Sequence, residues 1–160
     1  MTIHHKIDTK TAELIDEAIA ELPVKLGNLA AKLGVQVFRA TLPAGISGEI
    51  KKIGEDQYTI RINRHETVER QRFTLAHELG HFLLHRDLIG DGLSDDALYR
   101  SKLSNSVEYE ANRFAADLLM PRKEVERLLK MIWNSEDELI EYASKHFGVS
   151  AQAAQIRLGI

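Results

Sequence analysis

"RFTLAHELGHFLLH", residues 72–85, places three histidines four residues apart in an otherwise apolar stretch, with a glutamate directly after the first histidine. The apolar residues recur with a helical period, so the stretch predicts a buried helix that carries titratable side chains. Side chains four residues apart on a helix lie on nearly the same face, with Cβ atoms about 5–6 Å apart. His77 and His81 can therefore direct two imidazole rings at one point.

The stretch "HELGH", residues 77–81, matches the H-E-x-x-H motif of zincins, in which two histidines bind zinc and the glutamate is the general base. Two imidazoles at this spacing suit a tetrahedral zinc ion with Zn–N distances of about 2.0–2.1 Å. Glu78 is rotated by about 100° from His77 on the helix, so it can border the metal without ligating it. Five letters alone are weak evidence, and the helical context and a downstream third ligand strengthen the assignment.

Glu108 is the expected third ligand, in the helical stretch "EYEANRFAADLLMP" (residues 108–121). It lies beside Ala111 at the edge of an apolar stripe, where an unpaired carboxylate costs several kcal/mol and a zinc ion removes that cost. Asn112, one turn later, could accept a hydrogen bond from the far nitrogen of a ligating histidine and fix its tautomer. Glu110 is a rival ligand, but it lies about 200° around the helix from Glu108 and is expected to face solvent.

Two further residues of the histidine-rich stretch have expected roles. Gly80 costs a helix about 1 kcal/mol relative to alanine, so we expect it where the Glu108 helix comes close. His85 would lie about 12 Å along the helix axis from His77, too far to share an ion, and is expected to be structural and hydrogen-bonded. The remaining histidines are expected at the surface: His4, His5, His65 and His146.

The composition is that of an ordinary globular protein, with 160 residues, 44% hydrophobic and 28% charged, and it predicts a single domain over residues 1–160 with a helical tail over 136–160. A net charge of −3 does not favour binding to nucleic acid through phosphate neutralisation. The absence of cysteine excludes disulfides, thiolate zinc sites and cysteine nucleophiles, so a metal site must use His, Asp or Glu. Residues 1–20 do not resemble a signal peptide, and no run approaches 18 apolar residues, so no membrane span is expected.

The pattern along the chain predicts an α+β fold: a small antiparallel sheet packed against the zincin-type helix, with a helical C-terminal half. Three short β-branched runs predict a three-stranded antiparallel meander: "VQVFRATLP" (35–43), "ISGEIKKIG" (46–54) and "QYTIRIN" (57–63). Residues 86–105 predict a long polar loop. A first helix is expected over about residues 9–20, and a short second helix is expected to end at Gly34. Four more are expected in the C-terminal half: one capped by Ser104, one from Pro121 through Trp133, one that begins with a capping box of Ser135 and Glu138 and ends at Gly148, and one capped by Ser150.

"RQRFTLAHELGH" (70–81), followed by residues 108–121, resembles the ImmA/IrrE family of zinc metallopeptidases, a gluzincin-like group. The resemblance covers roughly residues 46–121 and is looser in the tail, "ASKHFGVSAQAAQIRLGI" (143–160). The positions that match the metal ligands of the family are His77, His81 and Glu108, and Glu78 matches its catalytic glutamate. We therefore expect one zinc ion per chain, with one coordination position left for water.

The resemblance implies a cytoplasmic prokaryotic endopeptidase that cleaves a helix-turn-helix transcriptional repressor, encoded beside it on a mobile element, a prophage or a stress operon. In the expected mechanism, zinc polarises the peptide carbonyl, and Glu78 takes a proton from water and passes it to the leaving amine. Tyr99 and Tyr109 are candidate oxyanion donors only because they are close in sequence. Residues 57–63 are the candidate edge strand for an extended substrate, and other substrate-binding residues are left open.

Two other functions are compatible with the sequence. Residues 136–147 and 151–158 could form a DNA-binding helix-turn-helix, although the second helix carries a single arginine and the chain is acidic. Alternatively, the chain could keep zinc as a toxin component or scaffold that binds a repressor without cleaving it. If these residues bind no metal, 77–81 would be an inert buried helix and Glu108 would lie on a solvated helix face. Arg70 and Arg72 are expected to anchor the helix start or a nearby carboxylate, and the oligomeric state is left open.

Overall fold

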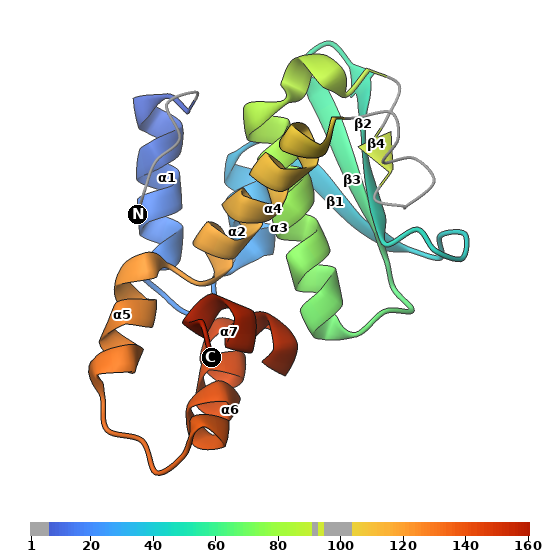
Figure 1. The fold of residues 1–160 in the computed structure, drawn as a ribbon. Helices are drawn as coiled ribbons and strands as arrows, with labels where there is room; N and C mark the ends of the chain where they lie inside the picture. The colour runs from blue at the N-terminus through green and yellow to red at the C-terminus, as the bar shows by residue number, and fades with distance from the viewer. Residues whose placement is uncertain (1–6, 91–92, 95–103) are drawn as a thin grey trace.

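Helix α3 (Val68–Leu84) lies at the centre of the fold, between the sheet and helix α4 (Asn105–Leu119) (Figure 1). It begins at Thr67, whose side chain accepts a hydrogen bond from the Arg70 N–H. From Thr74 onward nearly every residue of α3 is buried, because other elements cover it on several sides. The computed structural model describes residues 7–90, 93–94 and 104–160. Its α+β architecture, with a helical C-terminal half, confirms the predicted fold class.

Within the described residues, the sheet has four strands in the order β1-β3-β2-β4. The strands are β1 (Val35–Ala40), β2 (Gly48–Gly54), β3 (Gln57–Asn63) and β4 (Leu93–Ser94). Strands β2 and β3 form the predicted antiparallel hairpin, and β4 adds antiparallel to β2. Strand β1 instead pairs parallel to β3, so the sheet is mixed and the predicted antiparallel meander is wrong at its first strand.

The connection between β1 and β2 explains this difference. Seven residues, 41–47, carry the chain past the end of β3 rather than turning it back along β1. Asn63, at the end of β3, holds this connection: its backbone N–H donates to the Ser47 carbonyl at 2.8 Å, and its Nδ2 donates to the Ile46 carbonyl at 3.0 Å. A seven-residue segment is longer than the usual hairpin loop, so a meander was not required by its length.

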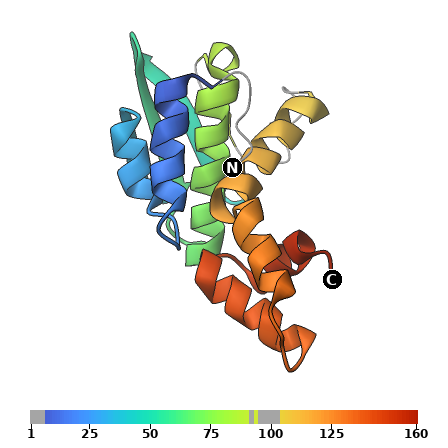
Figure 2. The ribbon, with the colours of Figure 1, turned by 90° about the vertical axis from the view of Figure 1, so that its left-hand side faces the viewer.

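The remaining helices surround this centre (Figure 2). Helix α1 (Thr9–Ile19) packs against α2 and α4, and α2 (Leu26–Lys32) packs against β1 and α3. A short 3-10 turn, η1 (Arg86–Leu88), follows α3, so with β4 the predicted loop 86–105 contains regular structure. Three helices form the C-terminal part: α5 (Arg122–Lys130), α6 (Glu136–Phe147) and α7 (Ala151–Leu158). Within the described residues, no helix has the length and apolar character that a membrane span needs.

The helix caps of the C-terminal half are largely as predicted. Ser104 and Ser150 accept hydrogen bonds from backbone N–H groups in the first turns of α4 and α7, and Gly148, with φ of 67°, ends α6. Ser135 caps α6 in the same way. The Glu138 carboxylate reaches back to the N–H of Asn134 at 2.7 Å, one residue before the position that a capping box would give.

Arg72 joins α3 to the C-terminal helices. Its guanidinium donates to the carbonyls of Gly148 and Val24, both at 2.9 Å, and of Phe147 at 3.3 Å. Arg72 therefore anchors the first turns of α3, one of its two predicted roles, but its partners are main-chain carbonyls of distant segments rather than a carboxylate. Buried apolar residues from α1 to α7 form one cluster, and these hydrogen bonds satisfy polar atoms at its edge.

Gly80 marks the crossing of α3 and α4. A Cβ atom at this position would lie 3.1 Å from Cδ1 of Phe114, 3.3 Å from the Ala111 carbonyl oxygen and 3.4 Å from the Ala111 Cα. Two of these three atoms belong to the backbone of α4, so the helices approach too closely for a methyl group to fit without movement. The predicted close approach at Gly80 is confirmed.

We predict that Gly80→Ala lowers the free energy of unfolding by about 1–3 kcal/mol, because the added methyl group overpacks the crossing. The matched control is Gly27→Ala, on the exposed side of α2, where the new Cβ would have no atom within 4 Å. Helix propensity alone should make that variant more stable by up to about 1 kcal/mol. Urea denaturation measures both changes, and equal stabilisation by the two substitutions would show that the crossing has room to spare.

Candidate metal centre

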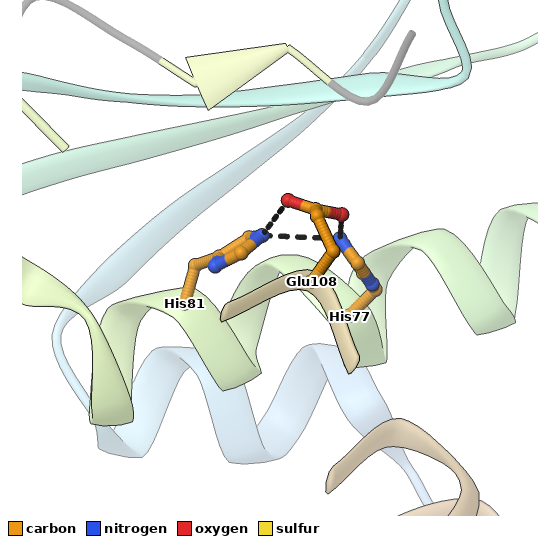
Figure 3. Close-up of side chains that lie close together, drawn as sticks. All are labelled: His77, His81 and Glu108. Atoms are coloured by element: carbon orange, nitrogen blue, oxygen red, sulfur yellow. Dashed lines mark hydrogen bonds and ion pairs between the residues drawn. The ribbon is translucent and has the colours of Figure 1, made fainter. Parts of the chain in front are cut away.

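The side chains of His77, His81 and Glu108 converge between α3 and α4 (Figure 3). The Nε2 atoms of the two histidines are 3.1 Å apart. One carboxylate oxygen of Glu108 lies 3.3 Å from Nε2 of His77, and the other lies 3.1 Å from Nε2 of His81. One ligand atom from each residue can be chosen so that all three lie within 4.8 Å of one another. The two elements that the sequence placed apart thus bring these three residues together.

The chemistry of this donor set fits a divalent cation. Ligand atoms of a tetrahedral ion with bonds of about 2.0–2.1 Å are about 3.3 Å apart, close to the observed separations of 3.1 and 3.3 Å. Nδ1 of His77 lies 2.8 Å from the Asn112 Oδ1 and donates to it, so the neutral ring that a metal ligand requires has its lone pair on Nε2. That lone pair points toward a carboxylate, an arrangement that a shared cation stabilises.

Glu108 has the ionisation state that a metal ligand requires. Burial raises the pKa of its carboxyl group, but hydrogen bonding and electrostatic attraction from His77 and His81 outweigh burial and hold the pKa far below its usual range. The side chain of Glu108 is 15% exposed, and those of the two histidines are nearly inaccessible. The site is therefore an ionised carboxylate facing two buried imidazoles at the edge of the protein interior.

Glu78 follows His77 on α3 and is 1% exposed. Consecutive helical residues are rotated by about 100°, so its carboxylate lies beside the histidine pair rather than in line with it. Its burial and its position directly after His77 are the observations on which a role for Glu78 can be proposed.

His85 lies one turn beyond His81 and is hydrogen-bonded to it. The Nδ1 atoms of the two rings are 3.0 Å apart, and Nε2 of His85 lies 3.2 Å from a carboxylate oxygen of Glu110. The prediction that His85 is hydrogen-bonded is confirmed, but the prediction that Glu110 faces solvent is wrong, since it is half-buried against His85. Helix α4 crosses the end of α3, so both flanks of its first turns face α3. The four-residue spacing of His81 and His85 was the sequence signal for this contact.

None of the other sequence candidates within the described residues joins the cluster. Tyr109 is 62% exposed and its hydroxyl accepts a hydrogen bond from Arg113, while Tyr99, His4 and His5 lie outside the described residues. His65 is exposed as expected, whereas His146 is half-buried and lies 2.8 Å from a carboxylate oxygen of Glu124. Strand β3 has a partner on each side, so the predicted edge strand at residues 57–63 is wrong.

A groove of about 690 Å³ opens beside the cluster, between the first half of α3, the outer face of α4 and α7. Asn112, the hydrogen-bond partner of His77, is one of its lining residues. Arginine side chains and apolar side chains share the lining: Arg70, Arg113 and Arg122 with Phe73, Ala116 and Ile156. This groove could not be predicted from local sequence patterns, because its walls come from three segments far apart in the chain.

Comparison with known proteins agrees with the geometry. Residues 30–159 match the Peptidase_M78 family, described as the IrrE N-terminal-like domain. The chain belongs to this metallopeptidase family. The family resemblance seen in the sequence is thereby confirmed, and the match extends beyond residues 46–121 on both sides.

Three curated proteins that are similar to this chain are named metalloproteases or metallopeptidases. The radiation response metalloprotease IrrE of Deinococcus radiodurans is 41% identical over 97 residues, covering 59% of this chain and 29% of the relative. IrrE of Deinococcus deserti is 40% identical over 101 residues, covering 62% and 35%. The metallopeptidase ImmA of Bacillus subtilis is 36% identical over 86 residues, covering 53% and 47%. The matched part thus spans less than half the length of each relative.

A solved structure shares the fold. A Mycobacterium tuberculosis transcriptional regulator superposes with a TM-score of 0.62 over 98% of this chain and 47% of its own, at 19% identity. At this identity the similarity concerns the fold alone.

Proposed function

We propose that the chain is a zinc-dependent endopeptidase that cleaves a helix-turn-helix transcriptional repressor encoded nearby. The observation that carries the proposal is the convergence of two histidine Nε2 atoms and the Glu108 carboxylate, next to the buried Glu78. Membership of a metallopeptidase family and the names of the relatives support the same chemistry. A repressor substrate would place the reaction in the cytoplasm.

In the proposed mechanism, His77, His81 and Glu108 hold the metal, and Asn112 fixes the ring of His77 with its Nδ1 proton pointing away from the site. Zinc bound there supplies a Lewis acid that polarises the peptide carbonyl and acidifies water. The Glu78 carboxylate accepts a proton from the attacking water, and the oxygen of that water bonds to the carbonyl carbon. Glu78 then gives that proton to the amide nitrogen as the C–N bond breaks.

The groove beside Asn112 supports a polypeptide substrate. It lies next to the hydrogen-bond partner of His77, and apolar and arginine side chains line it together. A groove with both apolar and cationic side chains can bind apolar, polar and acidic side chains of a polypeptide. We propose that part of the substrate lies in this groove when its scissile bond is at the cluster.

The contacts of α7 argue against direct DNA binding. Arg157 is the single arginine of this helix, and its guanidinium is bound to the Asp117 carboxylate at 2.8 Å and to the Met120 carbonyl at 2.9 Å. A side chain that is 10% exposed and already paired within the protein is poorly placed to contact phosphates. The pair α6 and α7 is therefore better explained as part of the fold than as a DNA-reading unit.

The metal assignment predicts one tightly bound zinc ion per chain, measured by elemental analysis and by competition with a chromophoric chelator. Glu108→Ala removes a ligand, and we expect its zinc affinity to fall by more than the roughly 10–100-fold that loss of an outer hydrogen-bond partner costs. Glu126→Ala, an exposed glutamate on α5, is the control and should keep full affinity. Unchanged zinc binding by Glu108→Ala would refute the assignment.

The catalytic assignment predicts that Glu78→Gln binds zinc as the unaltered protein does but cleaves its substrate at least roughly 100-fold more slowly, because glutamine cannot carry the proton. The assay incubates the protein with the repressor encoded by the adjacent gene and follows the fragments by electrophoresis and mass spectrometry. Glu126→Gln should cleave at the normal rate. Repressor binding without cleavage by the unaltered zinc-loaded protein would instead favour the scaffold function, and a shift of operator DNA would favour DNA binding.

A further inference from the structure

The third histidine of the stretch is connected to the metal-binding cluster by a chain of two hydrogen bonds. Nδ1 of His81 lies 3.0 Å from Nδ1 of His85, and Nε2 of His85 lies 3.2 Å from Oε1 of Glu110. The rings of His81 and His85 are both buried, and their centroids are 5.1 Å apart. Glu110, at the far end, is half-buried on α4. This chain lies on the opposite side of the His81 ring from Glu108.

The positions of the protons in this chain follow from its two ends. Nε2 of His81 faces the cluster, so a neutral His81 that offers a lone pair there carries its proton on Nδ1. Among the described residues, the partner of that N–H is Nδ1 of His85, so the proton of a neutral His85 lies on Nε2. The Nε2–H of His85 donates to the Glu110 carboxylate, which accepts hydrogen bonds and has none to give when ionised. A single tautomer of each ring is therefore consistent with the chain.

From this geometry, and on the basis of the proposed metal site, we propose that His85 and Glu110 are positioning residues that set the tautomer and ring orientation of His81. The carboxylate fixes the proton of His85, and His85 in turn fixes the proton of His81. The lone pair of His81 is thereby directed toward Glu108 and His77 before any ion binds. Outer partners of this kind typically contribute about 10–100-fold to metal affinity.

The two histidines of the cluster then have different outer partners. His77 donates to a neutral amide oxygen, that of Asn112, at 2.8 Å. His81 donates to an imidazole that is itself bound to a carboxylate, so its ring is the more electron-rich ligand. Asn112 lies on α4, and His85 is hydrogen-bonded to Glu110 of α4. Docking of α4 therefore orients both rings.

A purely structural role for His85 makes a different prediction. A buried imidazole with two hydrogen bonds can simply satisfy polar atoms at the end of α3, and its loss would then cost stability without changing the metal site. The control for that case is His146, a half-buried histidine whose Nε2 lies 2.8 Å from the Glu124 carboxylate on α5, in a second histidine–carboxylate pair outside the cluster. His146→Phe should lower stability and leave zinc affinity unchanged.

The test measures zinc affinity by chelator competition for the unaltered chain and four variants. We expect His85→Phe and Glu110→Leu to weaken zinc binding by about 10–100-fold and His146→Phe to have no effect. His85→Asn, whose side-chain oxygen can take the place of Nδ1 as acceptor, should recover most of the lost affinity. If His85→Phe does not fold, Glu110→Leu decides alone, since Glu110 is half-buried at the edge of α4.

Long-range ¹H–¹⁵N NMR of the histidine rings in the zinc-loaded protein provides an independent measurement. The proton of His85 should be found on Nε2 and that of His81 on Nδ1. Unchanged affinity in both variants, or a proton on Nδ1 of His85, would overturn the proposal while leaving the peptidase function intact. Failure of the unaltered chain to bind zinc would overturn both, and normal zinc binding without cleavage of the repressor would affect the proposed function alone.

Discussion

The close crossing of α3 and α4 at Gly80 is the constraint on which the candidate site depends. Ala111 rests against Gly80, and Glu108 lies one turn before Ala111 on the same face of α4. His77 and His81 lie on either side of Gly80 along α3. A wider crossing would move the carboxylate away from both rings together, so both distances between Glu108 and the histidines depend on the absence of a side chain at Gly80. The helical cost of a glycine is therefore offset by the site that it allows.

The electrostatics of the cluster explain why such a polar group can persist in the interior. Two imidazoles and an ionised carboxylate cost free energy when they are removed from water, unless each of them has a partner in the interior. Here each imidazole has a hydrogen-bond partner at Nδ1, and each Nε2 faces Glu108. Only the inward-facing atoms are left to share a positive charge. A divalent cation would supply that charge at the point where the donors already meet.

The parts of this structure that could be predicted from the sequence are those set by local spacing. The alignment of His77 with His81 and the caps at Ser104 and Ser150 depend on neighbours within four residues. The parallel pairing of β1 was not predictable in this way, because it depends on where residues 41–47 run in space. The prediction that Glu110 faces solvent was wrong for a related reason. The position of Glu110 around α4 follows from helical spacing, but whether that side meets solvent depends on the angle at which α4 crosses α3.

Helix α4 contributes a side chain to the metal-binding cluster and further side chains to the hydrogen bonds around it. Glu108 meets the two rings directly, Asn112 holds His77, and Glu110 reaches His81 through His85. All three lie within the first half of α4, so they arrive together when the helix docks on α3 and would leave together if it moved. Binding of a metal at the cluster is consequently coupled to packing in the core, since the ion stabilises only the arrangement in which α4 is docked. The same contacts that complete the fold thus assemble the chemistry.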